Sequence, residues 1–116
     1  MKHREGFILE RIIQYADEVA QTIEVMEINE ATFQNDFIAR NAITMCILQI
    51  GELANHLSEP FKQKYAQIPW QQIIGMRNKA AHGYWHMSHQ IIWQVATENM
   101  PELKTYCLQI LQQEAP

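Results

Sequence analysis

Hydrophobic residues recur at helical spacing along the first quarter of the chain. From about Glu5 to Met26, apolar side chains fall three or four positions apart, at Ile8, Ile12, Tyr15, Val19, Ile23 and Met26. Steps of three and four place side chains on one face of an α-helix. The pattern therefore predicts a first amphipathic helix with one buried face and an acidic, solvated opposite face.

The next apolar stretch is longer and apolar on more than one side. Residues 29–36 supply cap and turn formers, and Asn35 or Asp36 suits the N-cap of the helix that follows. From Phe37 to Leu57 the hydrophobic positions cover more than one stripe. A helix that is apolar nearly all round is normally enclosed by other elements. We expect it to be the central helix, and it is also a candidate for a subunit interface.

The second half of the chain predicts shorter helices. A short helix is expected over Phe61 to Tyr65, and a longer one begins near Pro69, a residue suited to a first helical turn. Ser88 is a candidate N-cap for residues 90–97. Pro101 then opens the last turns, so that the end of the chain forms either one kinked helix or two.

These elements together define the fold class. No alternating run rich in Val and Thr predicts a strand, so we expect an all-α bundle of four to five helices. The chain has 116 residues, of which 47% are hydrophobic, which suits one domain with one core over residues 1–116.

The sequence also indicates where in the cell the protein is expected. No apolar run reaches the roughly 18 residues of a membrane span, and residues 1–6 lead into a charged amphipathic segment, unlike a signal peptide. We expect a cytoplasmic protein with no membrane partner. Cys46 and Cys107 lie in apolar helical patterns without ligand-like spacing, which predicts reduced thiols in the core.

Charge is distributed unevenly along the chain. Residues 1–59 hold ten acids and four bases (−6), residues 60–97 hold four bases and no acid (+4), and residues 98–116 hold three acids and one base (−2), which gives the net −4. The middle window also holds three of the five histidines and all three tryptophans. This acid-free, aromatic-rich third is the expected place for contact with a polyanion.

The segment 77–84 gathers the reactive side chains of that window. Arg77 is a permanent cation whose planar fork of donors matches phosphate oxygens, and the His82 imidazole changes protonation near neutrality. In a straight helix these two residues lie about 140° apart around the axis, so they do not face one spot. Gly83 offers a way to end the helix, and we expect a break between about Ala81 and Met87.

The arrangement of Arg77, His82 and Tyr84, Arg-x4-His-x-Tyr, resembles the signature of HepT-like toxins within the HEPN superfamily. Asn78 fills the polar position that usually follows the arginine. The run Ile50-Gly51-Glu52 resembles the Ile-Gly-Glu of the family's second helix. The resemblance extends over nearly the whole chain and implies a HEPN-like helical bundle.

This resemblance implies a metal-independent endoribonuclease without a cofactor, acting as a homodimer with a shared cleft. RNA cleavage without a metal needs a base for the 2′-hydroxyl, an acid for the leaving 5′-oxygen and a cation on the phosphorane. His82 suits one of the first two roles and Arg77 the third. A two-fold dimer supplies two imidazoles to one cleft. Asn78 is expected to orient phosphate or His82, and Lys79 to hold a flanking phosphate.

Two further expectations concern Glu52 and Tyr84. Glu52 either hydrogen-bonds Arg77 and fixes its guanidinium or is a simple exposed residue. The family resemblance implies that Tyr84 is AMPylated by a partner nucleotidyltransferase, an MntA-like antitoxin. The added bulk and negative charge would then repel and exclude the substrate phosphate.

Other interpretations stay open from the sequence. His82, His86 and His89 have i, i+4, i+7 spacing suited to a transition metal, but no cysteine or acid lies near them and Gly83 interrupts the helix. Trp70, Trp85 and Trp93 can stack bases, although Trp70 and Trp93 fit core positions better. The alternative function is a non-catalytic helical partner that binds nucleotide or docks a nucleotidyltransferase.

Overall fold

The computed structural model describes residues 3–83 and 87–115, and all regular structure within them is helical. The predicted all-α class is therefore confirmed. Four long helices and several short ones follow one another in the order α1 (His3–Val25), α2 (Glu30–Asn35), α3 (Phe37–Asn55), α4 (Glu59–Lys64), α5 (Trp70–Gly83), α6 (His89–Gln94), the π-helical turn η2 (Val95–Asn99) and α7 (Met100–Gln113).

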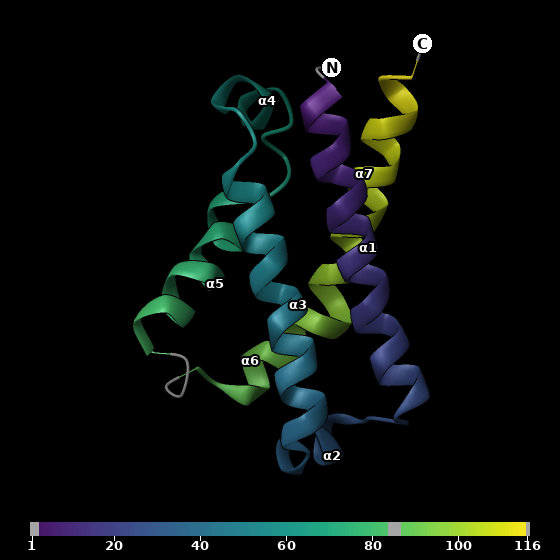
Figure 1. Ribbon diagram of the computed structural model, residues 1–116, viewed down its shortest axis with the longest axis vertical. Helices are drawn as coiled ribbons and strands as arrows, with labels where there is room; N and C mark the ends of the chain where they lie inside the picture. Colours follow the sequence, from purple (N-terminus) through teal and green to yellow (C-terminus); the bar gives the residue numbers. More distant parts are fainter. Residues whose placement is uncertain (1–2, 84–86, 116) are drawn as a thin grey trace.

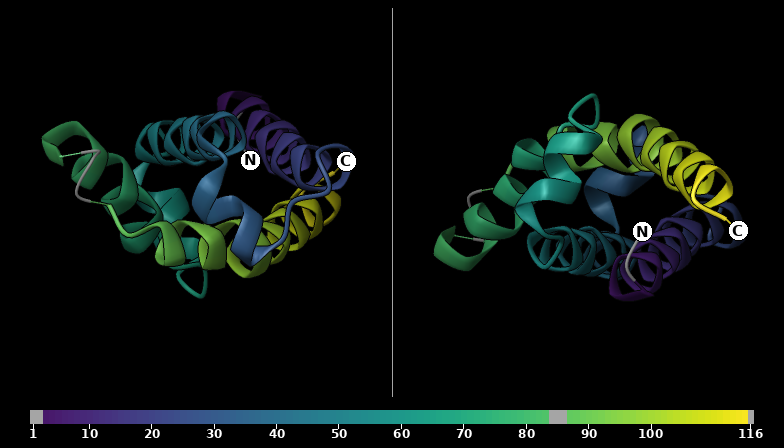
Figure 2. Two further views of the ribbon diagram at one scale, coloured as in Figure 1. Left: turned by 90° about the horizontal axis from the view of Figure 1, so that it is seen from below. Right: turned by 90° about the horizontal axis from the view of Figure 1, so that it is seen from above.

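The long helices form an elongated bundle with α5 at its edge. Helix α1 packs against both α3 and α7, while α5 packs against α3 (Figures 1 and 2). The described ends of the chain lie at the same end of the bundle as α4, and α2 closes the opposite end (Figure 1). Helix α5 therefore has α3 as its main helical neighbour, and it carries the segment that the sequence marks as reactive.

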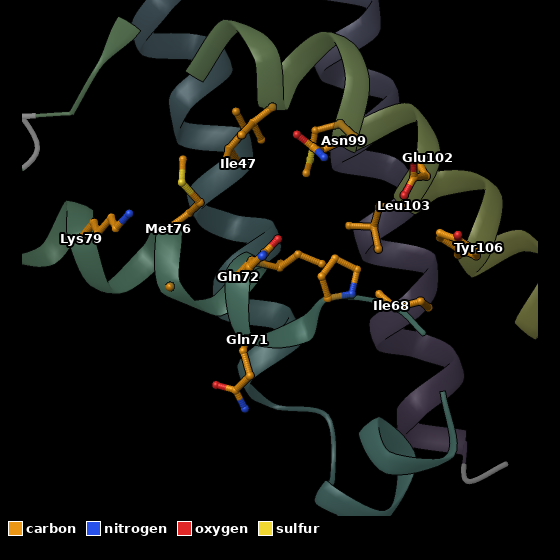
Figure 3. A pocket seen from close by; sticks show the side chains of 15 residues that line it. Ile47, Ile68, Gln71, Gln72, Met76, Lys79, Asn99, Glu102, Leu103 and Tyr106 are labelled. Carbon is orange, nitrogen blue, oxygen red and sulfur yellow. The ribbon is translucent and has the colours of Figure 1, made fainter. Parts of the chain in front are cut away.

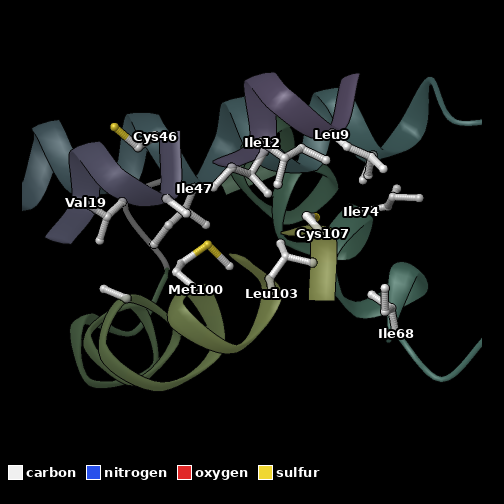
Figure 4. Close-up of a cluster of buried hydrophobic side chains, with 14 of the residues drawn as sticks. Leu9, Ile12, Val19, Cys46, Ile47, Ile68, Ile74, Met100, Leu103 and Cys107 are labelled. Atoms are coloured by element: carbon white, nitrogen blue, oxygen red, sulfur yellow. The ribbon is translucent and has the colours of Figure 1, made fainter. Parts of the chain in front are cut away.

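One continuous core joins the helices. Its fully buried side chains come from α1, α2, α3 and α7, with Ile68 entering from the loop before α5 (Figure 4). The ring of Phe33 in α2 lies 5.1 Å from that of Trp93 in α6, so the short helices also close the core. Trp70 is buried as expected, and its Nε1 donates to the carbonyl oxygen of Tyr65 at 3.1 Å.

The expectation for residues 29–36 is partly wrong. Residues 30–35 form the helix α2 where only caps and turns were predicted. The Asn29 side chain accepts from the N–H of Thr32, whose hydroxyl accepts from the N–H of Asn29, a reciprocal capping box that stabilises even a short helix. The N-cap of α3 is Asp36, whose carboxylate accepts from the N–H groups of Ile38 and Ala39.

The end of the chain is neither a simple kinked helix nor two separate ones. Ser88 caps α6 as predicted, and α6 runs through the π-helical turn η2 directly into α7. Pro101 lies at the start of α7, directly after the π-helical turn, and it has no N–H to donate to that turn. The wider π turn changes the register of the side chains just before this proline.

The two cysteines are buried and free, as the sequence predicted. Burial raises the pKa of the Cys107 thiol from 9.0 to about 12. Burial, with a smaller contribution from the negative charge of Glu18, also raises the pKa of Cys46. Both thiols therefore stay protonated at neutral pH and behave as small apolar core side chains.

By length and mean hydropathy, α3 alone among the described helices is apolar enough to cross a membrane, with a mean hydropathy of 1.2. The expectation that no segment meets this test therefore does not hold for α3. A core helix of a soluble protein passes the same test, and α3 buries Ile43, Ile47 and Ile50 in the bundle.

Gly51 lets α3 and α5 approach closely. A Cβ added at Gly51 would lie 2.9 Å from the Cβ of Arg77 and 2.9 Å from the carbonyl oxygen of Ile73. Real Cβ atoms essentially never come so close to other heavy atoms. Any larger residue at position 51 would therefore push α5 away from α3 and move Arg77.

We expect Gly51→Ala to lower the free energy of unfolding by about 1–3 kcal/mol, the usual cost of overpacking a tight contact. Gly75→Ala is the matched control, because nothing lies within 4 Å of a Cβ added there. That control should be neutral or stabilising by up to about 1 kcal/mol, since alanine is the better helix former. Urea unfolding of the three proteins measures this difference, and equal effects of the two substitutions would contradict the close-approach argument.

Candidate functional site

Arg77 is held from α3 by a carboxylate. Its Nε donates to Oε2 of Glu52 at 2.7 Å, and its Nη1 donates to the side-chain oxygen of Asn78 at 3.0 Å. The predicted contact between Glu52 and Arg77 is thus present. Both side chains are 41% exposed, so the guanidinium is oriented but still open to solvent. The N–H donors that described residues do not use remain available to an anion.

Asn78 differs from its expected arrangement. Its amide oxygen faces Arg77, the neighbouring residue, where the sequence suggested phosphate or His82 as partners. The bond holds the Nη1 side of the guanidinium while Glu52 holds the Nε side. Arg77 is therefore fixed from two directions, which lowers the conformational entropy that a bound phosphate would have to remove.

His82 lies on a different side of α5. The helix continues through His82 to Gly83, so Arg77 and His82 keep their separation of about 140° around the axis. His82 lines a shallow groove with Met76, Lys79, Gly83, Met87, Ser88, Ile91 and Ile92, and Arg77 is absent from that lining. Within one chain, the guanidinium therefore faces α3 while the imidazole faces α6.

The described part of α5 extends to Gly83, and Met87, at the end of the range predicted for a break, is not helical. Tyr84, Trp85 and His86 lie outside the described residues, so the expected role of Tyr84 stays a prediction. The proposed histidine metal site also includes His86. Across residues 3–83 and 87–115, no three His, Cys, Asp or Glu side chains gather closely enough to hold a metal ion.

The structure adds His56, which sequence reasoning missed. Its Nε2 lies 3.3 Å from Oε1 of Glu52, so one carboxylate bridges His56 and Arg77. The carbonyl oxygen of His56 also accepts a 2.7 Å hydrogen bond from Nη2 of Arg4, which ties the start of α1 to the end of α3. The i, i+4 spacing of Glu52 and His56 was the available signal for a shared helix face.

These contacts link basic side chains near the end of α3. His56 and Arg77 both contact the carboxylate of Glu52, and Arg4 binds the carbonyl oxygen of His56. Arg4 and Arg77 are permanent cations, so positive charge lies near the end of α3 although the net charge of the protein is −4.

Helix α5, the third long helix of this all-α bundle, thus carries both the arginine and the histidine of the motif. The chain belongs to the ribonuclease HepT-like family, whose sequence profile matches residues 9–110. The match spans α3, α5 and most of α1 and α7, and it includes Glu52, Arg77 and His82.

Curated relatives agree with this family. The chain is 30% identical over 106 residues to "Putative RNase TTE0752" of Caldanaerobacter subterraneus subsp. tengcongensis, covering 91% of this chain and 93% of the relative. It is 28% identical over 96 residues to "Probable ribonuclease HepT" of Thermococcus cleftensis, covering 78% and 86% respectively. No solved structure matches the chain.

Proposed function

We propose that the protein is a metal-independent endoribonuclease that acts as a homodimer in the cytoplasm. The observation that carries this proposal is the oriented, half-exposed guanidinium of Arg77 on the same helix as His82. Membership in a ribonuclease family gives the expected substrate, RNA.

The chemistry assigns separate tasks to the two residues. A neutral His82 removes the proton of the ribose 2′-hydroxyl, whose oxygen attacks the adjacent phosphorus. Arg77, held by Glu52, stabilises the added negative charge of the phosphorane. A protonated imidazole gives its proton to the leaving 5′-oxygen as the P–O bond breaks. One imidazole does not serve both ends of an in-line displacement, so a second copy of His82 is required.

The separation of Arg77 and His82 around α5 further favours a dimer, since a second chain can bring both kinds of group to one cleft. Helix α3 offers a surface for this contact. Ile38 and Met45 are apolar, and they are 61% and 56% exposed. Ile38, Met45 and Glu52 follow one another at intervals of seven residues. Residues seven apart lie within about 20° on a helix, so this apolar stripe leads to the Arg77 site.

We expect Arg77→Ala and His82→Ala each to lower RNA cleavage by about 10²-fold or more, with EDTA present throughout. Arg77→Lys should restore only part of the rate, because lysine keeps the charge but loses the fork of donors. Glu52→Gln should cause a smaller loss, since it weakens the orientation of Arg77 without removing it.

His3→Ala is a matched control for the histidine substitution, because His3 is exposed at the start of α1. It should leave the rate unchanged. Cleavage that survives both Arg77→Ala and His82→Ala would rule out the assigned roles. Wild-type protein that never cleaves RNA but binds nucleotide would instead identify the non-catalytic helical partner.

Met45→Glu tests the dimer. A charge placed in the apolar stripe should dissociate the protein into monomers at micromolar concentration and abolish cleavage together, as measured by light scattering and an RNA assay. Val25→Glu makes the same change at an exposed position outside the stripe and should leave the dimer intact. Wild-type protein that is monomeric and active would refute the shared cleft.

We further propose that the protein is the toxin of a toxin–antitoxin pair and that Tyr84 is the target of an MntA-like nucleotidyltransferase. In that reaction the Tyr84 oxygen attacks the α-phosphorus of ATP and pyrophosphate leaves, while the phenolic proton passes to solvent. The attached AMP adds negative charge two residues after His82 in the sequence, which would oppose binding of an RNA phosphate at the same site.

Co-expression with the partner enzyme should add AMP to the wild-type chain and suppress both its RNA cleavage and its toxicity to growing cells. The Tyr84→Phe variant should keep its activity and escape both the mass increase and the inhibition. Intact-protein mass spectrometry and growth curves measure these effects. AMP found on another residue with equal inhibition would contradict the role of Tyr84.

A further inference from the structure

A cavity of about 420 Å³ lies between α5 and the η2–α7 segment. Its apolar lining comes from α3, α5, η2, α7 and the loop before α5, and it includes Ile47, Ile68, Met76, Met100 and Leu103. Figure 3 shows the cavity with α5 on one side and α7 on the other. Its volume and its largely apolar walls are those of sites for small ligands.

A few polar side chains lie around this apolar lining. Lys79 lies at one end, and Glu102 and Tyr106 lie at the other, with Asn99 nearby (Figure 3). Among the residues that line the cavity, Glu102 is the one acid and Lys79 the one base. Glu102 is exposed and has no hydrogen-bond partner among the residues that the structure describes. Its carboxylate is therefore open to a ligand.

The cavity adjoins the His82 groove. Met76 and Lys79 line both, so a ligand that passes from one to the other crosses the same stretch of α5. Lys79 is then placed between the groove that holds His82 and the apolar cavity. An RNA strand with a phosphate near His82 can place a second phosphate at Lys79 and a base beyond it.

The local backbone also sets this region apart. Val95 and Asn99, the two ends of the π-helical turn η2, both line the cavity. Such turns are rare and occur frequently at functional sites, because they re-aim side chains that a regular helix would direct elsewhere. Here the turn brings the amide of Asn99 and the apolar side chain of Val95 to the same cavity.

We propose that this cavity binds a guanine base of the RNA substrate, next to the site of cleavage. This inference rests on the proposed function and adds a base preference to it. An ionised carboxylate only accepts hydrogen bonds. Guanine presents two adjacent donors, N1–H and the N2 amino group, on one edge. Adenine, cytosine and uracil each present a donor beside an acceptor, so Glu102 fits guanine best.

The other side chains support the same occupant. In this proposal the apolar walls contact the faces of the base, and Tyr106, which lines the cavity, supplies an aromatic ring for stacking. Lys79 neutralises the phosphate that a nucleotide brings, which offsets the unfavourable charge of Glu102 toward a polyanion. Asn99 supplies a donor and an acceptor for the remaining edge of the base.

The test compares GMP, IMP and AMP as probes and maps the sites cut in an RNA of mixed sequence. Wild-type protein should bind GMP about tenfold or more tightly than AMP, with IMP between them because it lacks the N2 amino group. Mapped cleavage sites should show guanine enriched at one fixed position. Isothermal titration calorimetry and sequencing of the cleaved ends give the two readouts.

Substitutions test whether GMP binds in this cavity. Glu102→Gln should remove the preference for GMP, whereas Glu98→Gln makes the same charge change one turn earlier, outside the lining, and should preserve it. Gly75→Leu should weaken GMP binding about tenfold or more by filling the cavity. It is expected to fold, because a Cβ at position 75 meets nothing within 4 Å.

The experiments distinguish failure of the guanine site from failure of the proposed nuclease activity. RNA cleavage that depends on His82 but shows no base preference, with no GMP binding, would overturn the guanine site and leave the nuclease intact. GMP binding that depends on Glu102 without any RNA cleavage would support the guanine site and overturn the proposed nuclease activity. GMP binding unaffected by Glu102→Gln and Gly75→Leu would place the ligand elsewhere and overturn the inference.

Discussion

The close approach of α3 and α5 at Gly51 is the contact on which the Arg77 site depends. A side chain at position 51 would collide with the Cβ of Arg77 and with the backbone at Ile73. Because Gly51 has no side chain, α5 lies close to α3, and the adjacent Glu52 reaches the guanidinium at 2.7 Å. One glycine thus sets the distance between two helices, and its sequence neighbour uses that distance to hold the arginine.

The same contact gives a physical reason for the Ile-Gly-Glu run. Ile50 is fully buried in the core, Gly51 faces α5, and Glu52 pairs with Arg77 at the half-exposed edge. Three consecutive residues therefore lie in three different surroundings: the core, the contact with α5 and the half-exposed edge. Glu52 also contacts His56, so one carboxylate holds an imidazole and a guanidinium close together.

Helix α5 is unusual in the bundle because its two sides face different surroundings. One side packs on α3 and carries Arg77, and the other carries Met76 and Lys79 along the His82 groove and the larger cavity. A helix in the middle of a bundle would have buried both sides. The edge position leaves one side of α5 open, and the proposed homodimer would bring Arg77 and His82 together from two chains.

The sequence by itself determined the helical class, the main helices and the segment around Arg77 and His82, because spacing, caps and motif residues are local properties. It also predicted the two buried thiols, and it offered a hydrogen bond between Glu52 and Arg77 as one of two alternatives. It missed α2, since a helix of only six residues beside a capping box resembles a turn in the sequence. It also overlooked His56, whose role depends on where the side chain of Glu52 points. Only the tertiary structure decided that Arg77 and His82 face different helices and that a cavity opens beside α7. Those facts depend on how distant helices pack, and packing is set by side-chain contacts between residues far apart in the chain.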